Sequence, residues 1–124
     1  MESMRPNPAF DPESYPDVLD AFSRLDSETT VNIWGADWCP DSRRELPDVA
    51  AVLEAADVPD GRISTYEVDR DKRGPAVDAY DVNRIPTVVV ERDGRELARF
   101  EEEEAVPAPQ YLASQLPETD LDHF

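Results

Sequence analysis

The chain has 124 residues, of which 29 are aspartate or glutamate and 12 are lysine or arginine, so its formal net charge at neutral pH is −17. This length fits one domain with a buried core of its own. A negative field of this strength repels phosphate backbones and anionic lipids, which excludes nucleic acids and membrane surfaces as expected partners.

The chain contains one cysteine, Cys39, so it cannot form an internal disulfide. A chain without disulfides is typical of a reducing compartment. Residues 1–6 hold one glutamate, one arginine and one proline and no apolar run, and no stretch approaches the roughly 20 apolar residues that a membrane helix needs. We therefore expect a cytoplasmic protein, and we expect it to be a monomer.

The acidic excess comes with almost no lysine, because Lys72 is the only one and every other basic residue is arginine. This balance resembles the proteins of salt-accumulating halophiles, in which concentrated salt screens the repulsion between carboxylates. We take a halophilic origin as a hypothesis about habitat. Equal stability by circular dichroism in dilute buffer and in molar KCl would contradict it.

In chain order, the first predicted segment is a mobile arm over residues 1–13, which has three prolines and no hydrophobic period. Residues 15–25 carry apolar side chains at helical spacing, which predicts a helix. Residues 29–35 are a short β-rich run typical of a buried strand. A second helix is expected to begin at Pro40, because proline suits the first turn of a helix.

The second half of the chain predicts mainly strands. Residues 63–68 form the next predicted strand, and residues 69–80 begin polar and are expected to end in a short helix. Residues 85–91 are an apolar run followed by Arg92-Asp93-Gly94, which is a hairpin signal. Residues 95–100 alternate between apolar and polar side chains as a last antiparallel strand should.

A closing helix is predicted over residues 107–116, with Tyr111, Leu112 and Leu116 facing inward. Strands joined through a crossover helix are expected to be parallel, whereas the two strands of a hairpin are antiparallel. The element order therefore predicts an α/β fold, with a mixed central sheet covered by helices on both faces.

The residues around the cysteine resemble those of a known family. A predicted buried strand leads into WGADWCPDS, residues 34–42, which is similar to the W-C-x-x-C segment of the thioredoxin superfamily. Pro47 matches the helix-kinking proline of that family. VNRIPTVVV, residues 82–90, resembles its cis-proline loop and the strand that follows.

The resemblance covers roughly residues 18–116 and implies a thioredoxin-like fold. The first strand of a full thioredoxin has no counterpart, so we expect a sheet of four or five strands. We therefore predict a thioredoxin-like domain over residues 14–117, preceded by the mobile arm of residues 1–13 and followed by a disordered tail over residues 118–124.

Physical chemistry favours a reactive Cys39 independently of the resemblance. A thiol in the first turn of a helix lies near the positive end of the helix dipole and near unpaired backbone N–H groups. Both favour the thiolate, which is the nucleophile. Arg43 and Arg44 favour the thiolate too, whereas Asp37 and Asp41 oppose it, so we expect a modest net gain. The alternative is a buried and inert cysteine.

Two positions depart from the family's pattern. Ser42 stands where dithiol members carry the resolving cysteine, and a hydroxyl does not attack a mixed disulfide. Ser42 is either natural, as in monothiol relatives, or an engineered replacement that traps such a disulfide. Ile33 stands where thioredoxins often keep a buried acid, so no general base is evident. Cys39 and Ser42 are therefore the predicted catalytic positions of a monothiol variant.

The resemblance also implies a substrate groove beside Cys39. Pro86 is expected to follow a cis peptide bond and to present the backbone of Ile85, where an extended substrate could pair as an extra strand. Trp38 would supply an apolar rim, and Pro40 lies next to the thiol at the start of the helix. These four residues are the predicted substrate contacts.

The leading hypothesis is a thiol–disulfide oxidoreductase that requires no cofactor. Cys39 would form a mixed disulfide with a protein or a low-molecular-weight disulfide, and an external thiol would resolve it. One alternative is a redox-silent module that binds a peptide at Pro86. Another is an iron–sulfur carrier like some monothiol glutaredoxins, although Pro40-Asp41 replaces their Gly-Phe. With His123 as the only histidine, no zinc site can form from cysteine and histidine ligands.

Overall fold

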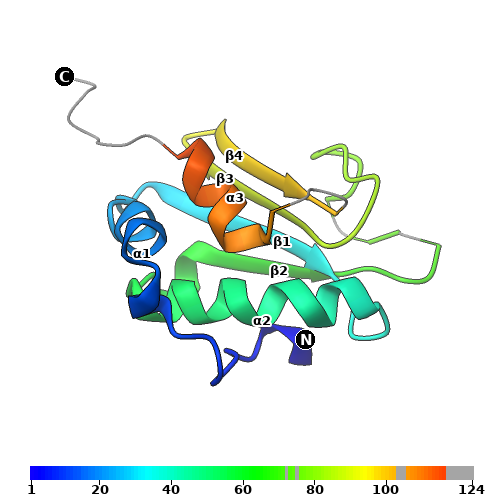
Figure 1. Ribbon diagram of the computed structural model, residues 1–124. Helices are drawn as coiled ribbons and strands as arrows, with labels where there is room; N and C mark the ends of the chain where they lie inside the picture. Colours follow the sequence, from blue (N-terminus) through cyan, green and yellow to red (C-terminus); the bar gives the residue numbers. More distant parts are fainter. Residues whose placement is uncertain (72, 75, 103–105, 117–124) are drawn as a thin grey trace.

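The computed structural model describes residues 1–71, 73–74, 76–102 and 106–116 (Figure 1). In chain order its elements, with η marking 3-10 helices, are η1 (Glu2–Met4), η2 (Pro12–Ser14), α1 (Pro16–Ser23), β1 (Thr29–Gly35), α2 (Pro40–Ala55), η3 (Asp60–Arg62), β2 (Ile63–Glu67), β3 (Thr87–Arg92), β4 (Arg95–Glu101) and α3 (Ala108–Gln115). Within these ranges, none of the helices has the length and apolar character needed to cross a bilayer.

The strands of the described residues form one mixed sheet in the order β2-β1-β3-β4. β1 pairs in parallel with β2 and antiparallel with β3, and β3 pairs antiparallel with β4. The β3–β4 hairpin turns at Asp93 and Gly94, whose φ angles are 52° and 80°. A two-residue hairpin turn of this kind requires positive φ at both positions, which glycine adopts without steric cost. The predicted α/β fold with a four-stranded mixed sheet is confirmed.

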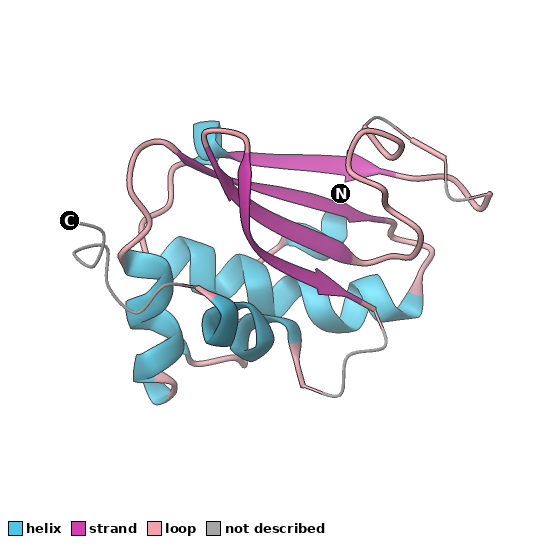
Figure 2. Cartoon of the chain, turned by 90° about the horizontal axis from the view of Figure 1, so that it is seen from above, coloured by secondary structure: helices cyan, strands magenta, loops and turns pink. Residues whose placement is uncertain are grey.

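One face of the sheet carries the larger core, which is built from aliphatic and phenyl side chains. Those that are almost fully buried include Phe22, Val31, Ile33, Leu46, Leu53, Val88, Phe100 and Leu112. They come from three strands and from α1, α2 and α3, and Figure 2 shows the helices together on one side of the sheet. We expected helices on both faces, but the three α-helices described here all pack on this one.

The opposite face is covered by the chain between β2 and β3. We predicted a short helix at the end of residues 69–80, and this prediction is wrong for the described part of that segment. A single helical turn forms there, in which the Tyr80 N–H donates to the Ala76 carbonyl over 3.1 Å. Ala76 and Asp81 have φ angles of 62° and 56°, and a right-handed helix cannot continue through such residues.

The N-terminal segment packs along α2 (Figure 1). Met1 and Met4 are partly buried against the core, and the Asn7 N–H donates to the Pro47 carbonyl over 3.0 Å. We predicted a mobile arm over residues 1–13 because that stretch has no hydrophobic period. In the structure the segment packs against α2 through a few separate contacts, and such contacts need no repeating hydrophobic pattern in the sequence.

The remaining parts of the predicted domain division stay predictions. Residues 118–124, expected to be a disordered tail, lie outside the described residues. The contacts of the N-terminal segment place it in the same packed unit as the predicted domain of residues 14–117. The boundary at residue 14 therefore stays a prediction.

Candidate functional site

Cys39 lies at the junction between β1 and α2, at the N-cap position of the helix. Its backbone is extended, with φ −94° and ψ 118°, and its N–H donates to the Ala36 carbonyl over 3.0 Å. Its own carbonyl accepts the first hydrogen bond of the helix, from the Arg43 N–H at 3.1 Å. The side chain makes no capping hydrogen bond and is 7% exposed. The thiol is therefore free, and nearly all of its residue is covered by neighbours.

The start of α2 provides the electrostatic setting that we expected. An N-cap side chain lies beside the unpaired N–H groups and the positive end of the helix dipole. Pro40 occupies the first helical position, where its missing N–H costs nothing. The guanidinium of Arg44, which we expected to favour the thiolate, pairs with Asp41 at 2.8 Å and with Glu102 at 3.5 Å. Asp41 first of all, and Glu45 after it, raise the pKa of Arg44.

Ser42 is fully buried one turn after Cys39. Its hydroxyl oxygen accepts a hydrogen bond from the Ala36 N–H at 3.2 Å, within the loop that leads from β1 to the cysteine. The hydroxyl also lies close to Gly35, where a Cβ would come within 3.1 Å of it. Ser42 therefore ties the first turn of α2 to the loop before Cys39, which is a structural task that sequence reasoning did not foresee.

Asp37 connects the cysteine loop to the N-terminus of the chain. Its carboxylate accepts hydrogen bonds from the N–H groups of Glu2 and Ser3, at 3.1 and 2.9 Å, and from the Ser3 hydroxyl at 2.9 Å. The bond from the Ser3 N–H is the main cause of a lowered pKa for Asp37. No local signal in the sequence predicts this contact, because the partners lie 34 and 35 residues apart in the chain.

Trp38 and Ile85 lie in the same buried cluster as Cys39, on the aromatic face of the sheet. Trp38 is half-buried and its indole Nε1 donates to the Val68 carbonyl over 3.2 Å. Its ring lies under the guanidinium of Arg70, with 5.0 Å between the guanidinium carbon and the ring centroid. The structure thus brings together three of the predicted site residues, which come from the loop before α2 and from the loop before β3.

The peptide bond between Ile85 and Pro86 is cis, and Pro86 is buried. The Pro86 carbonyl accepts a hydrogen bond from the Glu102 N–H at 3.1 Å, which extends the pairing of β3 with β4 by one residue. Within the described residues, no hydrogen bond engages the backbone N–H or carbonyl of Ile85. The main chain of Ile85 therefore keeps both of its hydrogen-bonding groups unused beside the cysteine cluster.

The described residues hold no group of three or more His, Cys, Asp or Glu side chains placed to bind a metal ion. Ile33, at the position where the related family often keeps a buried acid, is fully enclosed in the helical core. His123 lies outside the described residues.

Comparisons with known proteins agree with this geometry at the level of the fold. The chain matches a structure of thioredoxin-2 from the malaria parasite, at 20% identity over 73% of this chain and 82% of that one, with a TM-score of 0.52. It also matches a structure concerning thiol resolution in yeast mitochondrial 1-Cys peroxiredoxin, at 18% identity over 78% and 83% of the two chains, with a TM-score of 0.51. The fold is thioredoxin-like.

A mutant thioredoxin from Halobacterium salinarum matches at 24% identity over 80% of this chain and 83% of that one, with a TM-score of 0.48. Neither a protein-family model nor a curated protein sequence matches the chain. The two matches with TM-scores above 0.5 establish the thioredoxin-like fold, and the chemistry rests on the residues of this chain.

Proposed function

We propose that this protein is a monothiol thiol–disulfide oxidoreductase whose nucleophile is Cys39. The observation that carries the proposal is the position of Cys39 at the N-cap of α2, in one cluster with Trp38 and Ile85. A thiol at a helix N-terminus is favoured in its thiolate form, which is the reactive species in disulfide exchange. A cysteine that only fills space in the core gains nothing from the N-cap position of a helix, so the position favours a reactive thiol.

The proposed reaction has two exchange steps. The Cys39 thiolate attacks one sulfur of a substrate disulfide, forms a mixed disulfide with it and releases the other sulfur as a thiolate. An external thiolate then attacks the mixed disulfide, bonds to the substrate sulfur and releases Cys39 as a thiolate. After these two steps the remaining substrate sulfur is joined to the external thiol in a disulfide. A second external thiolate attacks that disulfide, releases the substrate sulfur as a thiolate and leaves the two external thiols joined as a disulfide. The substrate disulfide has then gained two electrons, and the two external thiols have lost them.

Ser42 takes no covalent part in this scheme. Its hydroxyl is buried and already accepts a hydrogen bond from Ala36, so its contribution is to hold the loop that carries Cys39. A hydroxyl in place of a second thiol leaves the resolving step to an external thiol, which makes the protein poor at the dithiol cycle. The expected partners are therefore a disulfide-containing protein and a low-molecular-weight thiol.

The substrate chain is proposed to lie against Ile85 and Pro86, with Trp38 and Pro40 at the edges of the contact. An extended peptide that pairs with the unused N–H and carbonyl of Ile85 would hold its disulfide beside Cys39. Pro40 is exposed and Trp38 half-buried, so both can touch a bound chain without rearrangement of the core. This arrangement needs no metal and no organic cofactor.

Titration with a chromogenic aromatic disulfide tests the proposal by stoichiometry. The native protein is expected to release one aromatic thiolate per chain and stop at the mixed disulfide. Ser42→Cys is expected to release two, because the introduced thiol attacks the mixed disulfide and expels the second aromatic thiolate. Cys39→Ser is expected to release none. Equal release from the native protein and Cys39→Ser would overturn the proposal.

A redox-silent binding module is the second candidate, and the low exposure of Cys39 is the observation that favours it. In that case the thiol would react with the aromatic disulfide only after the protein is unfolded by denaturant. A peptide would still be expected to bind at Ile85, with equal affinity for the native protein and Cys39→Ser. Reaction of the folded native protein decides for the oxidoreductase.

The remaining expectations about the setting of this protein are part of the same proposal. We infer a monomer in the reducing cytoplasm, where a lone cysteine remains a thiol. The net charge of −17 argues against nucleic acid and membrane surfaces as partners and favours a salt-rich habitat. Sedimentation equilibrium in molar KCl tests the monomer, and a stable dimer under those conditions would contradict it.

A further inference from the structure

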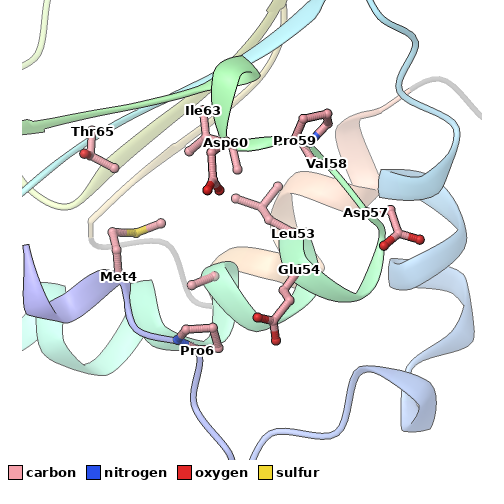
Figure 3. Close-up of a pocket in the computed structure, with 11 residues that line it drawn as sticks. Met4, Pro6, Leu53, Glu54, Asp57, Val58, Pro59, Asp60, Ile63 and Thr65 are labelled. Atoms are coloured by element: carbon pink, nitrogen blue, oxygen red, sulfur yellow. The ribbon is translucent and has the colours of Figure 1, made fainter.

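The outer edge of β2 lies beside a pocket in the described part of the molecule. β2 is the first strand in the order β2-β1-β3-β4, so the edge that faces away from β1 has no partner strand among the described residues. The pocket has a volume of about 670 Å³. Its walls come from the N-terminal segment, the second half of α2, the loop after it and β2 (Figure 3).

The floor of this pocket is apolar and its rim is acidic. Figure 3 shows Met4, Leu53 and Ile63 around the same space, each from a different segment of the chain. Glu54, Asp57 and Asp60 also line it, and all three are exposed. Within the described residues no ion pair engages any of the three. The rim therefore presents three carboxylates to a ligand.

The edge of β2 carries none of the devices that block strand addition. Edge strands are usually protected by lysine, by proline or by a β-bulge. β2 reads ISTYE, with small polar side chains at its centre and a charge only at its end, and its register with β1 is continuous from Ile63 to Glu67. An incoming strand would run about 4.8 Å from β2 and would find free backbone groups to pair with.

The side chains of such a strand would alternate between the two faces of the sheet. Ile63 and Thr65 line the pocket, whereas Tyr66 lies on the other face against Trp34. Every second side chain of an added strand would therefore enter the pocket. An apolar side chain suits the floor at Met4 and Leu53, and basic side chains on either side of it suit the carboxylates of the rim.

We propose that the β2 edge and this pocket bind an extended, positively charged peptide segment of another protein, with one apolar side chain seated in the pocket. Charge decides against a second copy of the chain, because that would bring two sets of unpaired carboxylates together on a molecule of net charge −17. The same carboxylates attract lysine and arginine. Backbone pairing with an exposed sheet edge is an established mode of peptide recognition.

This surface is separate from the thiol site. The two lie toward opposite ends of α2, since Cys39 is its N-cap and Glu54 belongs to its last turn. At 1.5 Å per residue they are about 22 Å apart along the helix. A partner held at β2 would therefore leave Cys39 uncovered, and the proposal holds whether or not Cys39 is redox-active.

The test uses a short fluorescent peptide, free of cysteine, with a central leucine, lysines two residues to either side of it and threonine elsewhere. Binding is measured by anisotropy with the full chain, in the native protein and in Cys39→Ser. Both are expected to bind alike, with amide NMR shifts concentrated at Ile63–Glu67. Shifts centred on the loop before Cys39 instead would overturn the proposal.

Two controls separate backbone pairing from general attraction. A peptide that is N-methylated at alternate residues cannot donate the strand hydrogen bonds and is expected to lose binding. The triple variant Glu54→Gln, Asp57→Asn, Asp60→Asn is expected to bind about fivefold more weakly or worse at low ionic strength. Asp71→Asn, Asp78→Asn, Asp81→Asn changes the net charge equally, away from the pocket, and should bind within about twofold of the native protein.

Three outcomes would contradict the proposal. If the N-methylated peptide bound as tightly as the unmodified one, strand pairing would be excluded. If both triple variants lost the same amount of affinity for the peptide, the binding would reflect the net charge of the protein and not the carboxylates at the pocket. Self-association of the native chain in molar KCl, with the amides of β2 protected from exchange, would identify a second copy as the occupant. Loss of disulfide exchange in Cys39→Ser bears only on the thiol site, so the two proposals fail independently.

Discussion

The two faces of the sheet are built differently, and the proposed chemistry belongs to the less regular one. One face packs against three helices through aliphatic and phenyl side chains. The other carries Trp34, whose ring lies 5.0 Å from the rings of both Tyr66 and Tyr80, under a chain segment made of turns. Cys39 and Ile85 are part of this second cluster.

The difference suggests a division of work between the faces. A face covered by helices gains its stability from close packing of side chains that carry no polar atoms. A face covered by turns leaves backbone groups such as those of Ile85 without a hydrogen-bond partner among the described residues, because turns satisfy fewer of them internally. The helical face would then supply most of the stability of the fold, and the turn-covered face would carry the thiol chemistry. Three substitutions test this division.

The largest effect is expected on the helical face. Phe100 is 1% exposed and its ring packs edge-on against Tyr111, 6.0 Å away. Phe100→Ala is expected to lower the free energy of unfolding by about 3–5 kcal/mol, because it removes buried apolar surface and leaves a cavity. Denaturant unfolding measures this loss. Val106→Ala, at an exposed position, serves as the control and should change stability by less than about 0.5 kcal/mol.

A smaller effect is expected from the hydrogen bond between Tyr80 and Glu91 on the turn-covered face. The Tyr80 hydroxyl donates to the Glu91 carboxylate, which also accepts from the Asn32 side-chain amide at 3.2 Å. Tyr80→Phe removes one hydrogen bond to a charged group and is expected to cost about 1–2 kcal/mol of unfolding free energy. Exchange of a disulfide at Cys39 should persist. A cost as large as that of Phe100→Ala would break the proposed division between the faces.

The same tyrosine predicts a pH dependence. The hydrogen bond to Glu91 raises the pKa of Tyr80 to about 12, so the folded protein holds this proton more tightly than the unfolded chain. Its stabilising contribution is complete below about pH 10 and is lost as the pH rises toward 12. The difference in stability between the native protein and Tyr80→Phe should shrink across that range.

The smallest effect is expected at the contact between the cysteine loop and the N-terminus. Asp37→Asn keeps the shape of the side chain but removes the charge that accepts from Glu2 and Ser3. We expect a loss of about 1 kcal/mol in unfolding free energy and faster proteolysis of the first residues. Asp78→Asn, on the turn segment away from this contact, should leave both unchanged.

This contribution of Asp37 should depend on pH in the acid range. Its pKa is lowered in the folded protein, first of all by the Ser3 N–H, so the stabilisation is present above about pH 4, the range of a free aspartate, and disappears as the pH falls through the folded value. Native protein and Asp37→Asn should therefore converge in stability at low pH. A constant difference down to complete protonation would show that the carboxylate charge is not what holds the N-terminus.

Local patterns were sufficient for the strands and for the position of the thiol. Residues 29–35 are predicted and observed as β1 with the same bounds, because β-branched and apolar residues there are flanked by turn signals. The hairpin after β3 follows from Asp93-Gly94, which suits positive φ at both positions. Cys39 at the start of a helix followed from the strand before it and Pro40 after it.

The errors arose where local signals were weak or misleading. Residues 69–80 were predicted to end in a helix, but left-handed backbone at Ala76 and Asp81 limits the segment to one turn. The residue types at these two positions do not predict that conformation. The arm of residues 1–13 lacked a period, yet Met1 and Met4 bury surface against α2. Tertiary contacts override such short stretches because their intrinsic preferences amount to little free energy.

The sequence by itself determined the fold class, the central strands and the presence of one thiol where a strand passes into a helix. Periodicity and turn chemistry act between residues close in the chain, so they can be read without coordinates. Only the tertiary structure decided that the three helices share one face of the sheet and that Asp37 holds the N-terminus. These contacts join distant segments, and their free energy exists only once the chain has closed the loops between them.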